Sequence, residues 1–520
     1  MIAKSKTARG ADMGLYDDLV PTEAEQRVLD ATKIGMAYQF ETESPSINGA
    51  AWGPECTVRS DFVAAFATSS QTNWEITPNG ITIIGAKIDG RLNLKHQNIL
   101  FPLSFDNCFF SDPIELLDTQ TKRLTFDNCF IEGGEYFSIR GDSLYVDGTL
   151  SFRNSYCNGE VRLLGARIDG QLSFIDTSIV CSKKKKGETD TFSLCAPNMV
   201  VDKDIMLVRS RFKGGVNVVG TDVNGQFACF ECSFQNDAGI DFNGERLNVK
   251  GNLLWNGIKM PPHASVVFSY ASVELLVDNS ESWPQSSNSL SLDGFKYRAL
   301  AGEPAPTDAK SRLDWLGRMA KDRYYPQPYE HLAKVLKEMG HTVDARKVLI
   351  AKQDREQEER QKERRFISYG WHWLLGKTTS YGYEPWRVFK WMFFLWAFGA
   401  MFFSNAFHYD YMQPSKERVF LDTCFVPQPD DTCENWIPAG RRWAKDARYI
   451  PADYTEFNSL IYSLDTFLPI VDLHQENYWL PGLDKPWSWF NRAYLWLHIV
   501  LGWMLTSIGV AGLTGIIKKD

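Results

Sequence analysis

The sequence lacks the motifs of the common enzyme classes. Its eight histidines are scattered through 520 residues, and no two lie at the short spacing that metal ligands usually share. There is no glycine-rich phosphate loop and no G-x-G-x-x-G motif after a strand. The single Cys229-x-x-Cys232 pair has no second pair, so we interpret it as core cysteine in preference to a zinc or redox site. We therefore predict a protein that is not an enzyme and has no cofactor.

Excess positive charge is also lacking. The net charge of -8 and the isoelectric point near 5.6 argue against general nucleic-acid binding. One local exception is the basic run of Lys183, Lys184, Lys185 and Lys186. Two explanations remain open for it: a solvated loop, or a binding site for an anion such as a nucleotide or oligonucleotide. An apolar leader is absent from residues 1–14, so we expect the N-terminal part to stay in the cytosol.

The ten cysteines fall into two groups. Eight lie in the segment from Cys56 to Cys232 and are typical of reduced core cysteine. The other two, Cys424 and Cys433, lie between two apolar segments near the C-terminus. That isolated pair predicts a disulfide, which survives only in an oxidising compartment.

From about residue 47 to residue 258 the chain repeats itself. Residues 103–109 read Leu-Ser-Phe-Asp-Asn-Cys-Phe, residues 124–130 read Leu-Thr-Phe-Asp-Asn-Cys-Phe, and residues 150–156 read Leu-Ser-Phe-Arg-Asn-Ser-Tyr. Alternating apolar residues predict short strands, and Asn-Gly and Asp-Gly pairs predict turns. A spacing near 21 residues suits one coil of a solenoid. We predict a right-handed β-solenoid, which resembles the degenerate pentapeptide-repeat and β-helix family.

Helical patterns flank the repeats. Before them, Thr22 and Glu25 form a capping box for a short helix with apolar Leu29 and Ile34, and Gly35 ends it. After them, residues 262–307 show no clear period and are predicted to cap the solenoid. Residues 311–375 have a helical pattern. Within them, residues 328–340 and 344–352 resemble a tetratricopeptide-type hairpin. A charged run at 355–365 follows, and then an aromatic segment at 369–375 that suits a membrane interface.

Two apolar segments close the chain. Residues 391–407 and 493–517 carry no Asp, Glu, Lys or Arg and predict two transmembrane helices. Residues 458–472 between them are apolar but too short to span, which predicts a re-entrant segment. Flanking basic residues place both termini in the cytoplasm, namely Arg360, Lys362, Arg364, Arg365, Lys377, Lys518 and Lys519. Arg441, Arg442 and Lys445, in the loop that would be external, count against that orientation.

This order of helix, short re-entrant helix, extended segment and helix resembles the pore module of two-helix tetrameric ion channels. The resemblance implies a pore helix at residues 457–468 and a filter at residues 469–473, which include Pro469, Ile470 and Val471. The glycine-rich potassium filter is absent, so potassium selectivity is not implied. Carboxylates at this depth are usually functional. We expect Asp472 to form a cation-attracting ring and Asp465 to brace the pore helix against a neighbour.

Small residues recur in the last apolar segment and allow helices to approach closely. Gly502, Thr506 and Gly509 share one face, and Ser507, Ala511 and Gly515 share another. Packing between subunits and a gating hinge both remain open as explanations.

The sequence thus predicts a multidomain membrane protein with an α-helical connector between its solenoid and a two-helix pore with a re-entrant helix. The expected parts are residues 1–40 (tail and short helix), 41–307 (cytosolic solenoid and cap), 308–380 (connector) and 385–517 (pore module). The expected function is a ligand-gated, cation-conducting homo-oligomer, a tetramer by resemblance, in the plasma membrane of a bacterium. The plan is similar to Hailong-type anti-phage channel effectors. The alternatives are a membrane-anchored oxidoreductase or other enzyme, and a membrane-tethered scaffold.

Overall fold

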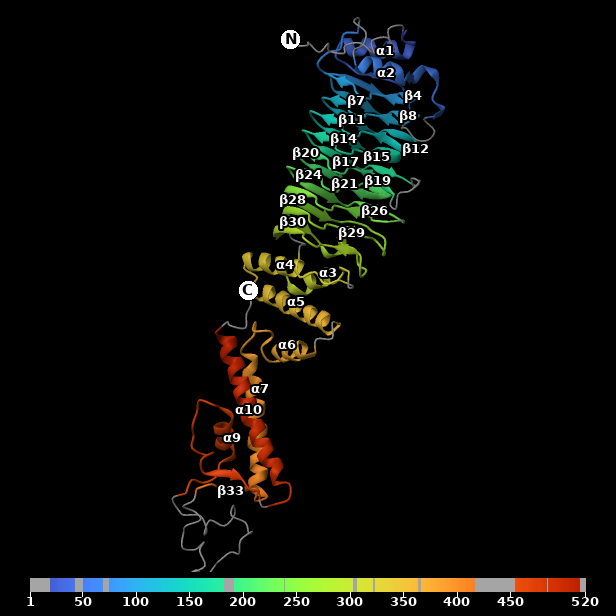
Figure 1. Cartoon of the computed structure of the whole chain (residues 1–520). Helices are drawn as coiled ribbons and strands as arrows, with labels where there is room; N and C mark the ends of the chain where they lie inside the picture. Colours follow the sequence, from blue (N-terminus) through green and yellow to red (C-terminus); the bar gives the residue numbers. More distant parts are fainter. Residues whose placement is uncertain are drawn as a thin grey trace, which may run out of the picture. The chain divides into compact units, whose positions relative to one another are not determined.

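The chain forms two compact units, residues 1–352 and 353–520, which are described separately below. This computed structural model (Figure 1) describes residues 19–42, 50–68, 74–181, 191–237, 239–302, 306–320, 323–362, 366–416, 454–483 and 485–514.

The first unit contains a β-solenoid of about nine turns. One turn consists of four short strands, β7 (Leu103–Asp106), β8 (Phe109–Phe110), β9 (Ile114–Glu115) and β10 (Gln120–Thr121). The next strand, β11 (Leu124–Asp127), lies parallel to β7 with Leu124 opposite Leu103. The stacked strands are seen from the blue to the green part of Figure 1, and the space-filling view shows side chains packed closely over them.

Parallel pairing arranges the strands in four columns. The first contains β1 (Tyr38–Gln39), β3 (Ile81–Ile84), β7, β11, β14 (Leu150–Arg153), β17 (Leu172–Ile175), β21 (Ile205–Val208), β25 (Phe227–Phe230), β28 (Asn248–Asn256), β30 (Ser272–Asp278) and β32 (Lys296–Ala301). The second contains β2 (Thr57–Arg59), β4 (Lys87–Asp89), β8, β12 (Phe130–Arg140), β15 (Tyr156–Arg162), β18 (Ser178–Val180), β22 (Arg211–Lys213) and β26 (Ser233–Gln235). The third contains β5 (Leu92–Asn93), β9, β12, β15, β19 (Phe192–Cys195), β23 (Gly215–Asn217), β27 (Phe242–Asn243), β29 (Val266–Val267) and β31 (Leu290–Ser291). The fourth contains β6 (Asn98–Ile99), β10, β13 (Tyr145–Val146), β16 (Arg167–Ile168), β20 (Val200–Val201) and β24 (Asp222–Val223), and joins β28.

The repeated Phe-Asp-Asn-Cys sequence is explained by the core and one corner of each turn. The Phe105 and Phe126 rings stack with centroids 5.5 Å apart, and Phe152 and Phe174 continue the stack. The asparagine that follows has a left-handed backbone, with φ of 50° at Asn128, which asparagine tolerates better than most residues.

The cysteine of the repeat belongs to a ladder of buried hydrogen bonds. Cys129 Sγ donates to the carbonyl of Phe105 one turn away, and Ser155 Oγ donates to Phe126 in the same way. Cys232 Sγ donates to Leu207 at 3.1 Å. All eight cysteines of the described residues are thiols, seven of them buried and Cys195 half-buried, and burial raises the thiol pKa of Cys157 to about 12. The interpretation of these residues as reduced core cysteine is confirmed, and the Cys424–Cys433 pair lies outside the described residues.

At the N-terminal end of the solenoid lies α1 (Glu23–Lys33), whose predicted capping box between Thr22 and Glu25 is present. Leu29 is buried, whereas Ile34 is 71% exposed. The Glu25 carboxylate also accepts hydrogen bonds from the side chain and backbone N–H of Arg59 at the start of α2 (Ser60–Ala67). A 3-10 helix, η2 (Pro54–Cys56), precedes β2.

We expect Glu25→Gln to loosen α1. Burial pushes the Glu25 pKa up, but the hydrogen bonds from Arg59 and Thr22 outweigh it and hold this pKa below the usual glutamate value. A lowered folded-state pKa stabilises the fold above the unfolded-state value, and this contribution disappears as the pH falls through the folded-state pKa. The substitution should cost about 1–2 kcal/mol at neutral pH. Hydrogen exchange of α1 amides tests this: equal α1 protection in Glu25→Gln and wild type at pH 7 would contradict it.

At the other end the strands continue further than predicted. β29 to β32 stack on the earlier turns up to Ala301, so the prediction that residues 262–307 only cap the solenoid is wrong. A short 3-10 helix, η3 (Ser280–Ser282), interrupts them. The cap is α3 (Ala309–Leu316), whose Arg312 forms a two-pronged ion pair with Asp278 of β30.

A helical hairpin follows, as predicted. It consists of α4 (Gln327–Glu338) and α5 (Thr342–Lys362), and Gly340 takes a positive φ of 89° at the turn. Leu332 and Leu336 of α4 are buried together with Val348 of α5. α5 begins in the first unit and continues into the second.

The second unit is mainly helical. After α6 (Phe366–Thr379) come α7 (Arg387–His408), the short α9 (Ser459–Phe467) and α10 (Ser488–Leu513). A small antiparallel pair, β33 (Met412–Pro414) and β34 (Trp479–Pro481), joins the segments after α7 and before α10. α7 and α10, drawn in orange and red in Figure 1, are long and apolar enough to cross a membrane.

Candidate functional site

The short helix α9 lies against both long helices of the second unit. It begins after Asn458, whose side chain accepts hydrogen bonds from the backbone N–H groups of Leu460 and Ile461. Its last residue is Phe467, just ahead of Pro469. Proline cannot donate a backbone hydrogen bond, so the helix ends where the sequence predicts an end.

Glycines in α7 and α10 allow α9 to pack closely against both helices. A Cβ atom on Gly502 of α10 would lie 1.9 Å from the carbonyl oxygen of Phe467, which no side chain can tolerate. A Cβ on Gly399 of α7 would lie 2.5 Å from Ser463 Oγ. Gly509 is less crowded, since its Cβ would lie 3.2 Å from Val388 Cγ1 of α7. Gly502 and Gly509 therefore pack against helices of the same chain, and Gly515 lies outside the described residues.

Between the three helices lies a buried polar cluster that sequence reasoning missed. Ser463 Oγ of α9 donates to the carbonyl of Trp396 in α7 at 2.9 Å. The Nε2 atom of His498 in α10 lies 3.2 Å from Ser463 Oγ, and the His498 side chain is 1% exposed. The available signal was one imidazole in an otherwise apolar segment. This cluster ties α9 to both long helices.

The loop after α9 folds back onto it. The prediction of an extended strand is wrong at its start, because the N–H of Val471 donates to the carbonyl of Leu468 and closes a turn. Asp465 then holds the loop: its carboxylate accepts from the backbone N–H groups of Leu473 at 2.5 Å and Glu476 at 2.8 Å. Asp465 therefore braces its own loop, and a role in bracing α9 against a neighbour stays a prediction.

The loop exposes an acidic and apolar tip. The side chain of Asp472 is 61% exposed and accepts from the backbone N–H of His474 at 2.9 Å. Ile470 is 80% exposed and Val471 is 38% exposed. Burial first, and then the charges of Asp465 and Asp472, raise the pKa of Glu476, a third carboxylate that the sequence did not single out. Nearby like charges disfavour the ionised form of a carboxylate, so Glu476 holds its proton to a higher pH than an isolated glutamate does.

A tight turn between α6 and α7 contacts α5. Ser380 and Tyr381 have positive φ angles of 48° and 56°, and Gly382 follows with 85°. The Tyr381 hydroxyl lies 2.8 Å from Asp354 Oδ1 and 2.7 Å from Gln357 Oε1, both on α5. Such strained backbone persists only where its surroundings fix it. The turn therefore fixes the C-terminal part of α5 to the beginning of α7.

The remaining predicted ligand site, Lys183 to Lys186, lies outside the described residues. No group of three His, Cys, Asp or Glu side chains within the described ranges is placed to hold a metal ion. Comparison of the chain with protein-family models, with curated proteins and with solved structures finds no match.

Proposed function

We propose that this protein is the subunit of an oligomeric, cation-conducting ion channel whose pore module is the α7–α9–α10 region. The observation that carries the proposal is the placement of α9, a nine-residue helix held between two long apolar helices and ending in an exposed, carboxylate-bearing loop. A helix pair serving only as an anchor needs no such insertion.

The dimensions suit a bilayer. α7 has 22 residues and α10 has 26, which correspond to about 33 Å and 39 Å at 1.5 Å per residue. α9 reaches only about 14 Å and cannot cross a hydrocarbon core of about 30 Å. Large apolar side chains are exposed along both long helices, as lipid contact requires; they include Phe389, Phe393, Phe394, Trp496, Val500 and Trp503.

The loop after α9 needs either protein or water around it. Its backbone is irregular, and lipid cannot satisfy irregular backbone at membrane depth. Symmetry in an oligomer would bring several copies of Asp472 around one axis, with Ile470 and Val471 beside them. A ring of carboxylates attracts cations and repels anions. A tetramer follows from the resemblance to two-helix channels.

The solenoid supplies the regulatory part of the proposal. α5 contacts α4 through its first half and the Tyr381 turn through its second half, so a change at either end can be passed along one helix. We place the solenoid in the bacterial cytoplasm and both termini on that side of the plasma membrane. The plan is that of a ligand-gated defence channel, with a nucleotide or oligonucleotide at Lys183–Lys186 as the anionic ligand.

Asp472→Asn is expected to lower the preference for cations over anions several-fold, because it removes one charge per subunit from the proposed ring. The measurement is the reversal potential of purified protein in planar bilayers under a salt gradient. Asp30→Asn, the same charge change on exposed α1, is the matched control and should leave the potential unchanged. Identical reversal potentials for Asp472→Asn and wild type would place Asp472 away from the pore.

A further inference from the structure

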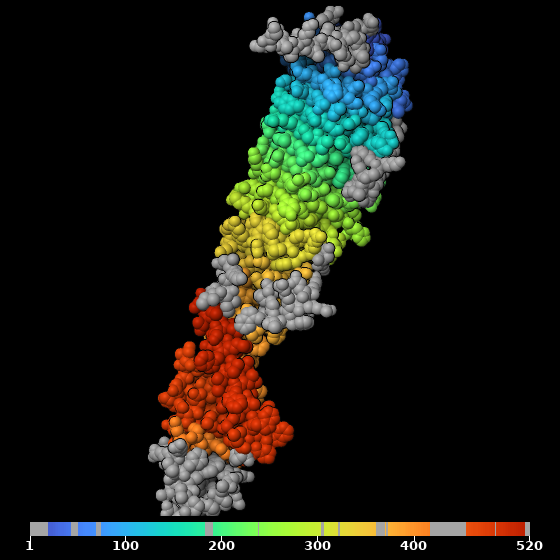
Figure 2. Space-filling view, in the orientation of Figure 1, coloured from blue at the N-terminus to red at the C-terminus, as the bar shows by residue number. Residues whose placement is uncertain are grey.

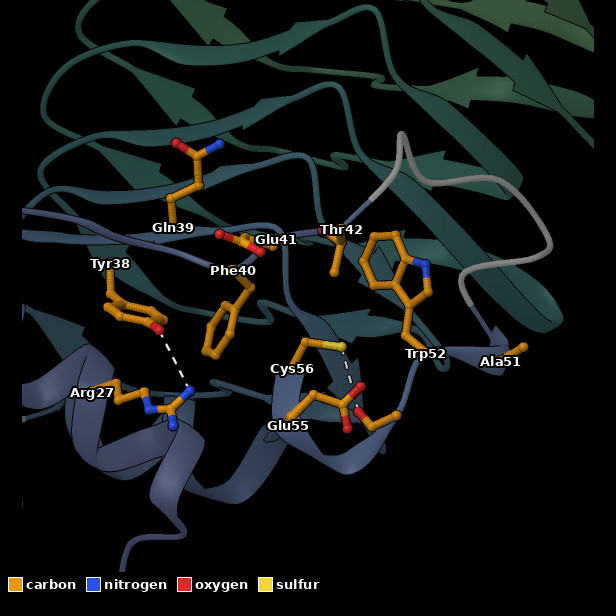
Figure 3. A pocket seen from close by; sticks show the side chains of 11 residues that line it. Arg27, Tyr38, Gln39, Phe40, Glu41, Thr42, Ala51, Trp52, Glu55 and Cys56 are labelled. Atoms are coloured by element: carbon orange, nitrogen blue, oxygen red, sulfur yellow. Dashed lines mark hydrogen bonds between the residues drawn. The ribbon is translucent and has the colours of Figure 1, made fainter.

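A cavity of about 680 Å³ lies at the N-terminal end of the solenoid. Its walls come from α1, from the chain that continues β1, and from η2 with the residues before it (Figure 3). The volume falls within the range of about 300–1,000 Å³ that small-molecule sites occupy. The residues of the proposed pore play no part in this cavity.

Aromatic side chains form much of its lining. Tyr38 and Phe40 lie on the strand side with ring centroids 4.9 Å apart, and the Trp52 ring borders the same space. The strand side is well anchored, because Phe40 N donates to Ile84 O and Thr42 Oγ1 donates to Gly85 O. Rigid aromatic faces recognise flat apolar groups and, through their negative π surfaces, cations.

The charges around the cavity do not cancel. The guanidinium of Arg27 is paired with Glu23 at 2.5 Å and donates to the Tyr38 hydroxyl at 3.4 Å. Glu41 and Glu55 also line the cavity, and within the described ranges neither forms an ion pair. Gly53 leaves room for the Glu55 carboxylate, since a Cβ there would lie 2.4 Å from both oxygens. Two carboxylates with no cation of their own therefore share a space with three aromatic rings.

We propose that this cavity is a binding site for a small organic cation that carries an aromatic or apolar group, with Glu41 and Glu55 neutralising its charge and Trp52 and Tyr38 packing against its body. An anion fits poorly here, because the one guanidinium in the lining is already paired. The site thus differs in charge preference from the anionic ligand proposed at Lys183–Lys186. Binding is independent of the channel proposal; only an effect of this cation on the current would rest on it.

Isothermal titration calorimetry of the full-length protein in detergent tests the site with three probes of similar shape. Phenethylamine is the cation, 2-phenylethanol the neutral analogue and phenylacetate the anion. We expect phenethylamine to bind at least about tenfold more tightly than 2-phenylethanol, because charge attraction and cation–π contact are added to the same apolar contact. Phenylacetate should not bind measurably.

Glu41→Gln with Glu55→Gln should weaken phenethylamine about tenfold and bring its affinity close to that of 2-phenylethanol. Trp52→Ala should weaken both ligands. Glu75→Gln, the same charge change at an exposed residue outside the lining, should leave all three unchanged. Hydrogen exchange of α1 amides verifies that the variants keep the fold. Equal binding of amine and alcohol to wild type, tighter binding of phenylacetate, or no binding of any probe at millimolar concentration would overturn the proposal.

Discussion

Gly502→Ala is expected to displace α9 and abolish the ionic current, although it adds a single methyl group. Alanine is the better helix former by about 1 kcal/mol, so propensity alone would stabilise α10. The new Cβ, however, would lie 1.9 Å from the backbone carbonyl oxygen of Phe467, and backbone cannot rotate away as a side chain can. Overpacking of this kind typically costs about 1–3 kcal/mol. Hydrogen exchange of α9 amides and bilayer current are the two measurements.

Gly509→Ala is the matched control on the same helix. Its Cβ would lie 3.2 Å from Val388 Cγ1, a side-chain atom that can shift by a few tenths of an ångström. We expect this variant to keep both the protection of α9 and the current. Normal protection of α9 in Gly502→Ala would show that α9 does not pack on α10 as described.

Arg312→Met is expected to destabilise the C-terminal end of the solenoid. The Arg312 guanidinium and the Asp278 carboxylate are 1% and 0% exposed, and two hydrogen bonds of 2.8 Å and 2.7 Å join them. Removing one partner leaves an uncompensated buried charge, which costs about 3–5 kcal/mol. Hydrogen exchange of the β30 and β32 amides should therefore rise by roughly 100-fold or more.

The control for Arg312→Met is a double variant that removes both charges. Asp278→Asn keeps an oxygen that can accept the hydrogen bond from Trp283 Nε1, which lies 2.7 Å from Asp278 Oδ2. The double variant Asp278→Asn with Arg312→Met should therefore be more protected than Arg312→Met alone. Equal exchange in the two variants would show that the loss comes from packing and not from the unpaired carboxylate.

Some of this structure could be predicted because its causes are local in sequence. The Phe-Asp-Asn-Cys repeats place the core ring, the left-handed corner and the ladder donor within four residues. The Asn458 side chain caps the start of α9, and Pro469, which has no backbone N–H to donate, lies just after its end. The two apolar segments follow from length and composition alone.

The last turns of the solenoid escaped prediction because residues 262–307 contain no copy of the Phe-Asp-Asn-Cys repeat. Tyr270 takes a left-handed φ of 58° at a corner where earlier turns place residues of several types, among them His96, Asp118 and Arg246. Pairing of β28 with β30 and of β30 with β32 outweighs the backbone strain at Tyr270, and no pattern in the neighbouring residues predicts this pairing. The Arg312–Asp278 pair is likewise invisible in sequence, since it joins residues 34 apart.

The candidate site was predicted in outline only, for the same reason. The fold of the loop after α9 depends on Asp465, which reaches forward to the N–H groups of Leu473 and Glu476. The contact between Ser463 and His498 joins α9 to α10 across 35 residues. Composition indicates that polar groups lie in an apolar segment, but only the packed helices show which of them meet.

The most direct test of the channel proposal is the current through a planar lipid bilayer into which purified wild-type protein has been reconstituted. We expect discrete, cation-selective conductance steps that disappear with Gly502→Ala and lose cation preference with Asp472→Asn. Protein that inserts into the bilayer, keeps the protection of α9 and carries no current with or without nucleotide, oligonucleotide or phenethylamine would contradict the assignment of a pore.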